Sequence, residues 1–359
     1  MQPKKLMFYI NTLGTGGAER VMSQLANHFF RAGYEVHLVT SFPVDGEYPA
    51  DEGVRRYSLE EQELSQSRLM RNISRIAKLR KLCKQIKPNV LISFMQEPNF
   101  RAILAATGLP VKTVVSVRND PNREYGGKVG RFVGKHIMPR ADGCVFQTAQ
   151  AQVWFSEKLQ KRSAIILNEV SESFFKVERT GAQHVVSLGR LSAQKNHAML
   201  IRAFGRIADK HPDQNLLIYG KGDYAEMLEQ MIGELGLQER VKLMGVTNQV
   251  HEVHSNAGVF VLSSDYEGMP NALMEAMAVG VPSISTDCPC GGPEMLIRDG
   301  ENGMLVPVGD EDAMAAALDK LLSDPQLAHR MGEQARIDAQ RYTPEKIFRE
   351  WKAFIDQYI

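Results

Sequence analysis

Short apolar runs, rich in β-branched and aromatic residues, alternate with segments of helical periodicity from one end of the chain to the other. Runs of this kind indicate strands, and strands that alternate with helices are typical of parallel sheets covered by helices. The pattern therefore predicts an α/β fold. The twelve predicted strands are residues 6–10, 36–40, 90–94, 113–117, 143–147, 164–167, 184–188, 215–219, 241–244, 258–262, 281–285 and 303–307.

The predicted strands fall into two groups of six, separated by a polar segment between Leu167 and Gly181. A chain of 359 residues is longer than one hydrophobic core usually supports, which also favours two domains. Both groups show the same alternation of strand and helix. We therefore predict two Rossmann-like domains, residues 1–170 and 171–342, that face each other across a cleft.

The last segment, residues 343–359, is predicted to be helical with no further strand. Thr343 is a common helix-capping residue. Pro344 suits the first helical position, because its missing amide hydrogen needs no partner there. The two predicted domains are therefore followed by a terminal helix.

Composition restricts the class of protein. Apolar residues make up 43% and charged residues 24% of the chain, and no stretch approaches the roughly 18 apolar residues of a membrane span. The first ten residues are too poor in apolar side chains for a signal peptide, so a cytoplasmic protein is expected. The four cysteines fit neither a disulfide framework nor a zinc ribbon. A net charge of +1 lacks the basic excess of nucleic-acid-binding proteins, so no nucleic-acid partner is expected.

A glycine-rich loop, N-T-L-G-T-G-G-A-E-R, follows the first predicted strand and precedes a helical pattern. Gly16 and Gly17 allow the backbone to approach a bound group and leave helix N-terminal amides available for an anion. A dinucleotide fingerprint would need glycine at Glu19 and an acidic residue near Thr40 and Ser41, so a dehydrogenase is disfavoured. Contact with a phosphate or sugar is the favoured interpretation, and a tight turn without a ligand is the alternative.

The fourth predicted strand ends in S-V-R-N-D-P. Ligands of parallel α/β sheets bind at the carboxyl ends of the strands, which makes Arg118 a candidate for the functional site. The alternative is an internal ion pair between Arg118 and Asp120 that only shapes the loop.

The segment 68–87 contains eight basic residues and no acid. Its apolar residues recur at helical spacing, which predicts one apolar stripe beside a cationic face. Basic amphipathic helices favour anionic lipid surfaces, so the segment is a candidate for peripheral membrane contact. A helix packed on the sheet with a solvated basic face is the alternative. The predicted stripe consists of Leu69, Ile73, Ile76, Leu79, Cys83 and Ile86.

In the second half, the predicted strand 184–188 runs into R-L-S-A-Q-K-N-H, which places Arg190 and Lys195 in one loop before a helix. Two cations at the end of a parallel strand can hold a diphosphate without a metal ion. Transfer from a sugar nucleotide builds negative charge on the departing diphosphate, and fixed charges that stabilise it usually contribute most to catalysis. Arg190 and Lys195 are therefore predicted catalytic residues.

The most specific motif, D-Y-E-G-M-P-N-A-L-M-E-A-M, follows the predicted strand 258–262. Pro270 suits the first turn of a helix, which leaves Glu267 in the loop and Glu275 on the helix. Glu267 can accept hydrogen bonds from sugar hydroxyls and Glu275 from a ribose diol, although an isolated Glu275 would more simply be a helix-surface acid. The amides that begin this helix can bind a phosphate. The residues predicted to bind the donor are Gly16, Gly17, Arg190, Lys195, Glu267, Gly268, Met269, Pro270, Asn271, Ala272, Leu273 and Glu275.

Together these motifs resemble glycosyltransferase family 4, whose members have the two-domain GT-B fold, and the resemblance covers nearly the whole chain. The family's E-x7-E motif matches Glu267 through Glu275, its basic pair matches Arg190 and Lys195, and its N-terminal glycine loop resembles residues 16–20. The resemblance implies a retaining transferase with a nucleotide diphosphate sugar on the C-terminal half and an acceptor mainly on the N-terminal half. It also implies that the final helix crosses back to the first domain.

One position departs from the family pattern, because many members carry histidine where this chain has Arg118. Arg118 therefore stays a catalytic candidate beside Arg190, Lys195 and Glu267. The resemblance further implies a UDP-sugar donor, the commonest in the family, with no metal ion or other cofactor required. The acceptor would be a polyprenyl- or otherwise lipid-linked saccharide, extended with a hexose or N-acetylhexosamine at the inner face of the cell membrane for surface polysaccharide, lipopolysaccharide or glycan.

The residues alone leave three other functions open. A glycoside hydrolase could use Glu267 and Glu275 as its carboxylate pair, but it has no use for a phosphate site. A sugar-nucleotide epimerase shares the GT-B architecture, and the E-x7-E spacing disfavours it. A non-catalytic sugar- or nucleotide-binding module would be expected to carry an export signal.

Two further groups of residues have simpler structural interpretations. The acids at 310–312 spell a metal-diphosphate motif of the other glycosyltransferase fold, but acids at a helix start explain them better. His251 and His254 could share a helix face, yet zinc needs more ligands than these two. No metal site is predicted.

Overall fold

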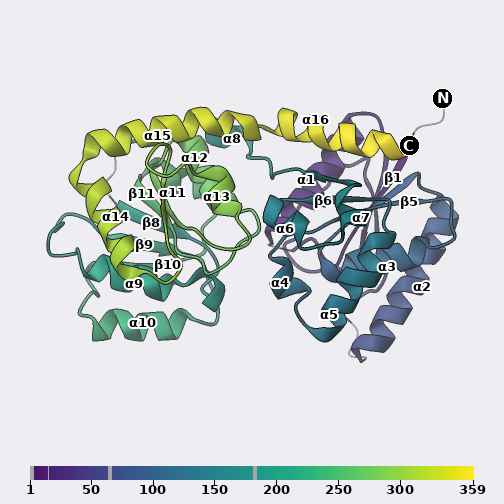
Figure 1. The fold of residues 1–359 in the computed structure, drawn as a ribbon, viewed down its shortest axis with the longest axis horizontal. Coiled ribbons are helices and arrows are strands. Elements are labelled where there is room, and N and C mark those ends of the chain that lie inside the picture. The colour runs from purple at the N-terminus through teal and green to yellow at the C-terminus, as the bar shows by residue number, and fades with distance from the viewer. Residues whose placement is uncertain (1–3, 15, 64–66, 181–183) are drawn as a thin grey trace. The chain divides into compact units, whose positions relative to one another are not determined.

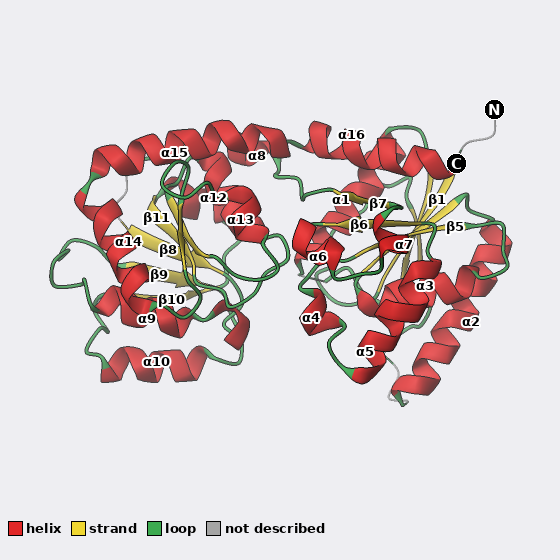
Figure 2. Cartoon of the chain, viewed as in Figure 1, coloured by secondary structure: helices red, strands yellow, loops and turns green. Residues whose placement is uncertain are grey.

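The computed structural model describes residues 4–14, 16–63, 67–180 and 184–359. Two compact units divide the chain: the first comprises Met1–Glu169 with Glu345–Ile359, and the second comprises Val170–Pro344. The first unit is therefore assembled from both ends of the sequence. Gly181, one end of the predicted boundary segment, lies outside the described residues. Each unit is built on a parallel sheet with helices on its faces (Figures 1 and 2).

In the described residues, the sheet of the first unit has seven parallel strands. They are β1 (Lys5–Ile10), β2 (Glu35–Thr40), β3 (Arg55–Ser58), β4 (Val90–Phe94), β5 (Lys112–Ser116), β6 (Gly143–Phe146) and β7 (Ser163–Ile165). Their order across the sheet is β3-β2-β1-β4-β5-β6-β7. Within β1, Leu6, Phe8 and Ile10 pack into one apolar cluster and Met7 and Tyr9 into another. β1 is thus buried on both faces, which explains its continuous apolar run.

Each of the twelve predicted strand segments overlaps a strand of the structure, and β3 is the described strand that the hydrophobic pattern missed. Its R-R-Y-S sequence has no apolar run, and its side chains are largely exposed. β3 lies at the edge of the sheet and pairs with β2 alone, from His37 opposite Arg55 to Thr40 opposite Ser58. An edge strand with exposed faces leaves no hydrophobic pattern to detect.

The helices of the first unit cover both faces of its sheet. α1 and α16 contribute to the cluster that contains Phe8, whereas α2 and α3 contribute to the cluster that contains Tyr9. Trp351 of α16 is 1% exposed and lies against Phe94, so the terminal helix completes the core of this unit. These helices are α1 (Gly17–Arg31), α2 (Arg68–Ile86), α3 (Gln96–Ala106), α4 (Pro121–Glu124), α5 (Lys128–Phe132), α6 (Ala149–Val153), α7 (Glu157–Gln160) and α16 (Pro344–Ile355), with the short turns η1 (Val133–Ile137), η2 (Met138–Arg140) and η5 (Asp356–Tyr358).

The predicted amphipathic division of residues 68–87 is only partly correct. Leu79 and Cys83 are buried, but Leu69 is 70% and Ile73 is 54% exposed, so the apolar stripe leaves the core toward the start of α2. Arg75, expected on the cationic face, is buried and its guanidinium pairs with Glu60 at 2.7 Å. No helix among the described residues combines the length and apolar content needed to cross a bilayer.

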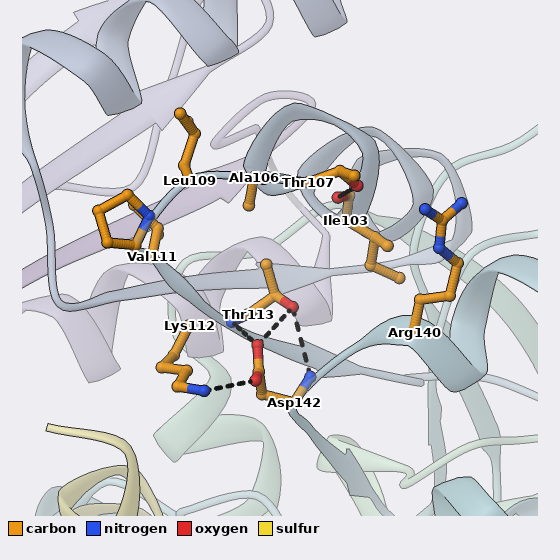
Figure 3. Close-up of a pocket in the computed structure, with 11 residues that line it drawn as sticks. Ile103, Ala106, Thr107, Leu109, Val111, Lys112, Thr113, Arg140 and Asp142 are labelled. Atoms are coloured by element: carbon orange, nitrogen blue, oxygen red, sulfur yellow. Dashed lines mark hydrogen bonds and ion pairs between the residues drawn. The ribbon is translucent and has the colours of Figure 1, made fainter.

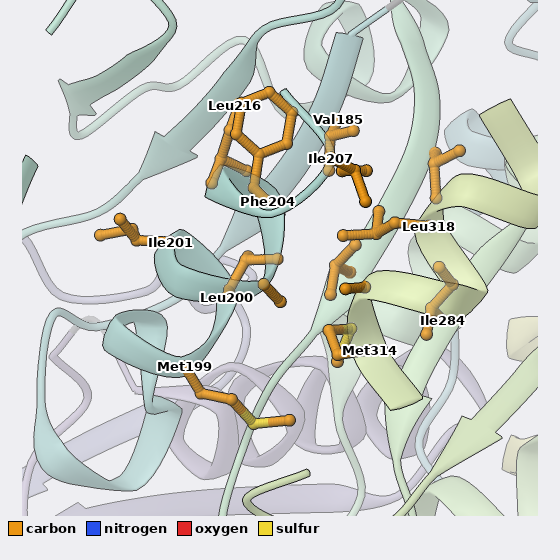
Figure 4. Packing of buried hydrophobic residues seen from close by; sticks show 14 of the residues in the cluster. Val185, Met199, Leu200, Ile201, Phe204, Ile207, Leu216, Ile284, Met314 and Leu318 are labelled. Carbon is orange, nitrogen blue, oxygen red and sulfur yellow. The ribbon is translucent and has the colours of Figure 1, made fainter. Parts of the chain in front are cut away.

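The second unit repeats the same design with a six-stranded parallel sheet in its described part. Its strands are β8 (His184–Leu188), β9 (Leu216–Tyr219), β10 (Val241–Gly245), β11 (Ala257–Leu262), β12 (Ser283–Thr286) and β13 (Met304–Val306), in the order β10-β9-β8-β11-β12-β13. Figure 4 shows how Leu200 and Phe204 pack with Met314 and Leu318 over this sheet. The helices are α8 (Glu172–Phe175), α9 (His197–Gly205), α10 (Ala225–Glu234), α11 (Val250–Ser255), α12 (Asn271–Val279), α13 (Gly292–Leu296), α14 (Glu311–Ser323) and α15 (Pro325–Ala339), with turns η3 (Ala193–Lys195) and η4 (Gln340–Tyr342).

Candidate active site

β8 and β11 are neighbours in the second sheet, so the loops that follow them lie at the same edge. Hydrogen bonds fasten the two loops to each other. The Asn196 side-chain amide donates to the Asp265 carboxylate at 2.8 Å, and the Ser263 hydroxyl donates to the carbonyl of Lys195 at 2.8 Å. The Asp265 amide also donates to the carbonyl of Gln194 at 2.8 Å. The predicted basic loop and the predicted acidic loop therefore form one rigid surface.

Lys195 and Glu267 meet at this surface. The Lys195 ammonium donates to Oε1 of Glu267 at 2.6 Å, and the Ser264 hydroxyl donates to the same oxygen at 2.7 Å. Their side chains are 18% and 9% exposed, so a little of each faces solvent. Gly189 lies beneath the lysine, because a β-carbon there would approach Cε of Lys195 to 3.1 Å. The pair holds a cation in a fixed position at the strand ends, which is the arrangement that a departing phosphate requires.

The loop after β12 holds the backbone of Glu267. The Glu267 amide donates to the carbonyl of Pro289 at 2.7 Å, and the Cys290 amide donates back to the carbonyl of Glu267 at 2.9 Å. Burial, followed by the nearby Glu267 carboxylate, raises the pKa of the Cys288 thiol to about 12. Gly292 is required here, since a β-carbon would stand 1.9 Å from the carbonyl oxygen of Gly268. The C-P-C-G-G segment thus supports the site through its backbone, and the Cys288 thiol stays protonated.

α12 presents its amino terminus at the same edge. Its first intrahelical bond runs from the Met274 amide to the carbonyl of Pro270, so the amides of residues 271–273 precede the hydrogen-bond ladder of the helix. Pro270 precedes the helix as its N-cap instead of lying in the first turn. Glu275 is 6% exposed on this helix, which contradicts the alternative of a surface acid. Gly268 and Met269 are buried in the connecting loop.

Arg190 differs from Lys195 in its surroundings. It follows β8 and is exposed, and the structure assigns its side chain no hydrogen bond or ion pair among the residues described. An exposed guanidinium on this loop can turn toward an anion without breaking an internal contact. The two predicted cations therefore comprise one fixed group and one adaptable group.

Arg118 lies in the first unit, just after β5, and is 7% exposed. Its guanidinium donates to the Asn168 side chain and stands 4.5 Å above the ring of Phe94. Burial lowers the pKa of Arg118 to about 9, and the Glu124 carboxylate opposes that shift. The alternative of an ion pair with Asp120 is wrong for the described residues, because the Asp120 carboxylate accepts from the Asn122 amide at 3.0 Å and caps α4.

Glu124 was not predicted as a site residue. Burial raises the pKa of its carboxyl to about 7, with a further increase from Asp120 and a decrease from Arg118. One carboxyl oxygen of Glu124 and the Nε of Arg118 are buried without hydrogen-bond partners in the described structure. Unpaired buried groups of opposite hydrogen-bonding capacity can receive the hydroxyls of a polar ligand. A lone glutamate in the sequence carries no signal of this kind.

The glycine loop after β1 is less open than predicted. Gly16 caps α1, and the carboxylate of Glu19 lies against it, so that a β-carbon at Gly16 would be 2.0 Å from Oε2 of Glu19. The acid lies in the first turn, where the helix dipole favours a negative charge. An anion at Gly16 and Gly17 would therefore have to share this terminus with a carboxylate.

The acids at 310–312 and the two histidines at 251 and 254 have structural surroundings in the second unit. Asp310 caps α14 by accepting from the Ala313 amide at 2.8 Å, which confirms that the acids at 310–312 open a helix. His254 is buried, and burial lowers its pKa to about 3. His251 stacks on Phe174 with ring centroids 4.1 Å apart. No group of three histidine, cysteine or acidic side chains suited to a metal ion occurs in the part of the chain that the structure describes.

A cavity of about 320 Å3 lies at the amino ends of β5 and β6 in the first sheet, whereas Arg118 follows the carboxyl end of β5 (Figure 3). Asp142 accepts hydrogen bonds from the amide of Thr113 at 2.9 Å and from the ammonium of Lys112 at 3.0 Å. These bonds tie two strand beginnings together. None of the predicted site residues lines the cavity, and its charged lining residues are Arg140 and the paired Lys112 and Asp142.

Comparison with known proteins matches both halves of the chain. Residues 170–338 match the family described as glycosyl transferases group 1, and residues 15–171 match glycosyltransferase family 4.

Two relatives from Campylobacter jejuni are similar over almost the whole chain. The N-acetylgalactosamine-N,N'-diacetylbacillosaminyl-diphospho-undecaprenol 4-alpha-N-acetylgalactosaminyltransferase is 28% identical over 366 residues, with 97% of this chain and 98% of the relative covered. The GalNAc-alpha-(1->4)-GalNAc-alpha-(1->3)-diNAcBac-PP-undecaprenol alpha-1,4-N-acetyl-D-galactosaminyltransferase is 29% identical over 363 residues, with 98% of each covered.

Solved structures agree on the fold. Sucrose-phosphate synthase from Thermosynechococcus elongatus superimposes with a TM-score of 0.86 at 19% identity, covering 99% of this chain and 98% of that one. Anabaena HepE, in complex with UDP, superimposes with a TM-score of 0.82 at 18% identity, covering 99% of this chain and all of that one. Two parallel-sheet Rossmann-like domains of this kind are the GT-B fold. The protein therefore belongs to glycosyltransferase group 1, family 4, and is a retaining glycosyltransferase.

Proposed function

We propose that the protein transfers a hexose or N-acetylhexosamine from a UDP-sugar to a lipid-linked saccharide during the assembly of a surface polysaccharide, lipopolysaccharide or glycan. The observation that carries this proposal is the 2.6 Å contact between Lys195 and Glu267, made at the strand ends beside the amino terminus of α12. The two Campylobacter jejuni relatives are named for undecaprenol-linked acceptors, and HepE was solved with UDP. These names support the donor and the acceptor class.

In this proposal the diphosphate of the donor lies against Lys195, Arg190 and the first amides of α12, those of Asn271, Ala272 and Leu273. One hydrogen of the Lys195 ammonium is given to Glu267, which leaves two for phosphate oxygens. The buried Glu275 accepts from the two hydroxyls of the ribose. Positive charge and helix amides stabilise the diphosphate as it leaves.

Glu267 has two tasks in the proposed site. Its Oε1 is occupied by Lys195 and Ser264, which fixes the cation. The structure gives its Oε2 no hydrogen bond within the described residues, so this oxygen is available to accept from a hydroxyl of the transferred sugar. The predicted sugar contact and the observed ion pair are therefore compatible in one carboxylate.

The proposed reaction needs no nucleophile from the protein. The acceptor hydroxyl oxygen forms a bond to the anomeric carbon on the face from which the diphosphate leaves, while the bond from that carbon to the phosphate oxygen breaks. The proton of the hydroxyl passes to the departing phosphate. Residues 171–342 would bind the donor in this scheme, and residues 1–170, with Arg118, would bind the acceptor.

A location at the inner face of the cell membrane is part of the proposal, with residues 68–87 contacting anionic lipid. The structure restricts which cations can take part, because most of them already have internal partners. Arg68 pairs with Glu97, Arg71 with Glu63, Arg75 and Lys78 with Glu60, and Arg80 donates to the carbonyls of Ala105 and Thr107. The contact is therefore assigned to Lys81, Lys84 and Lys87 at the end of α2.

The test is a donor screen followed by product analysis. The purified protein is incubated with UDP-hexoses and UDP-N-acetylhexosamines, with and without undecaprenyl-diphosphate-linked saccharides, and UDP release and product are measured. We expect UDP release that depends on the acceptor, and a product with the anomeric configuration of the donor. Conversion of a UDP-sugar to its epimer, or hydrolysis of a finished glycoside, would contradict the proposal.

A further inference from the structure

The segment between Tyr125 and Ala141 holds four lysine or arginine residues and no acid. α5 and the turn η1, which continues it, form most of this segment. The structure pairs none of the four cationic side chains with an acid among the residues it describes. They are Lys128, Arg131, Lys135 and Arg140.

Two large apolar side chains stand among these cations. Val129 is 77% and Phe132 is 58% exposed, and the Phe132 ring lies beside the neighbouring His136 ring, with centroids 4.9 Å apart. Lys128, Arg131 and Lys135 are also exposed. The outer side of this helical segment is therefore both apolar and cationic.

The inner side of the segment explains why its apolar residues point outward. A β-carbon at Gly130 would stand 2.8 Å from the backbone of Tyr125, and one at Gly134 would stand 2.7 Å from the ring of Trp154. Val133, 7% exposed, is the larger residue between them. Gly130, Val133 and Gly134 therefore form the side of the segment that packs on the domain, and Val129 and Phe132 lie on the exposed side.

We propose that α5 and η1 form a second docking element that inserts Val129 and Phe132 into an anionic lipid bilayer, with Lys128, Arg131 and Lys135 at the headgroups. Exposed apolar side chains flanked by cations bind the interface of such bilayers through both apolar burial and charge attraction. Long lysine and arginine side chains reach back to the headgroups while the apolar residues enter the acyl region.

A bilayer fits this surface better than a protein partner does. The cores of protein interfaces are depleted of lysine, whereas here three exposed cations surround the two apolar residues. The comparison with α2 also favours this element, because the Arg68 and Arg71 side chains near the exposed Leu69 of α2 are already paired with acids. α5 thus offers apolar side chains together with cations that are free for phosphate groups.

The test measures binding to vesicles and does not depend on the proposed transfer reaction. Sedimentation with vesicles of 30% phosphatidylglycerol in phosphatidylcholine is compared for the full-length protein and for the double variant Val129→Ser/Phe132→Ser. We expect the variant to lose roughly tenfold or more of its partition coefficient, the effect of removing two buried apolar side chains. The matched control is Ile337→Ser, which changes a 63% exposed apolar residue of the second unit.

A charge variant separates the two parts of the proposed contact. Arg131→Glu/Lys135→Glu should abolish the preference for anionic over pure phosphatidylcholine vesicles, while Lys158→Glu, an exposed lysine of the same unit, should not. A Phe132→Trp variant should show blue-shifted fluorescence with vesicles. Equal binding of Val129→Ser/Phe132→Ser and the unchanged protein would overturn the proposal, as would no vesicle binding at all. If Lys81→Glu/Lys84→Glu removed binding while both α5 variants kept it, α2 would be the docking element instead.

Discussion

The carboxyl ends of the strands carry different electrostatics in the two units. In the second unit, the loops after β8 and β11 bring Lys195 and Glu267 into a direct ion pair that still reaches solvent. In the first unit, the loop after β5 buries Arg118 against a neutral amide and an aromatic ring. The same α/β design therefore holds a neutralised cation in one unit and a cation without a carboxylate contact in the other.

This difference indicates which ligands suit the carboxyl ends of the strands in each unit. A lysine held by a glutamate is fixed in place and can accept a strongly charged diphosphate, since the site already offers helix amides to share the charge. A buried arginine beside an enclosed carboxyl of raised pKa is suited to neutral hydroxyls, which bring no charge of their own. We therefore assign charge stabilisation to the second unit and positioning of the acceptor to the first.

The largest expected effect comes from breaking the ion pair of the second unit. Lys195→Ala and Glu267→Ala should each lower kcat at least tenfold, and on the order of a hundredfold for the lysine, the cost of losing one preorganised contact to the leaving group. The double variant should be much less impaired than the product of the two single effects, because the residues act as a unit. Steady-state kinetics with Lys320→Ala as a surface control measure this.

Retention of near-normal activity in both single variants would refute the roles given to this pair. Strictly multiplicative effects in the double variant would show that the two residues act separately. Circular dichroism and thermal unfolding should show all variants folded, since the side chains lie at the edge of the core.

A smaller effect is expected from Arg118 in the first unit. Arg118→Lys should lower kcat/KM for the acceptor by about tenfold, because the ammonium loses the planar fork that donates to Asn168 while keeping the charge. Donor binding, measured as the Kd of UDP, should stay unchanged. A large rise in that Kd would instead place Arg118 at the donor and contradict the assignment of the acceptor to the first unit.

Glu275 tests the ribose contact within the second unit. Glu275→Gln should weaken binding of UDP by about tenfold, the value of a charge-assisted hydrogen bond. It should not weaken binding of 2'-deoxy-UDP to the same extent, because that nucleotide lacks one of the two hydroxyls. Equal losses for both nucleotides in titration calorimetry would argue for a structural role of this buried acid.

The dependence of stability on pH should have opposite sign for the buried histidines of the second unit and for Glu124 of the first. Burial lowers the pKa of His197 to about 4 and of His254 to about 3, so the unfolded chain binds protons that the folded second unit does not. Its stability should fall as pH drops below about 6.5, by at most about 1.4 kcal/mol per pH unit for each histidine. The raised pKa of Glu124 means that stability of the first unit falls as pH rises from 4.5 toward 7.

Hydrogen exchange resolved along the chain, measured across this pH range, separates the two units. Glu124→Gln should remove the contribution of Glu124 to the slope of the first unit and leave that of the second unchanged, and Glu157→Gln, an 87% exposed acid, should change neither. Identical slopes in both units would contradict the assigned pKa shifts.

Much of the fold could be predicted because burial leaves a pattern in the sequence. β1 packs on both faces and has a continuous apolar sequence, and each predicted strand segment overlaps a strand of the structure. β3 was not predicted, because an exposed edge strand has no such pattern. The residues proposed to bind the donor could be predicted for a related reason, since strand ends, glycines and helix starts are local features.

The sequence did not predict which charged side chains pair with one another. The sequence placed Lys195 and Glu267 in two loops, but their contact depends on β8 and β11 being neighbours in the sheet. It predicted a cationic face on residues 68–87, yet Arg75 is buried against Glu60 and its neighbours are paired as well.

The sequence by itself therefore determined the α/β class, the two groups of strands and the chemical character of the loops that follow β8 and β11, because these depend on residues close together in the chain. Only the tertiary structure decided that Glu267 holds Lys195, that Arg118 is buried without a carboxylate contact, and that Val129 and Phe132 face outward. Each of these outcomes depends on contacts between distant segments, and charge pairing and burial are properties of such contacts rather than of local sequence.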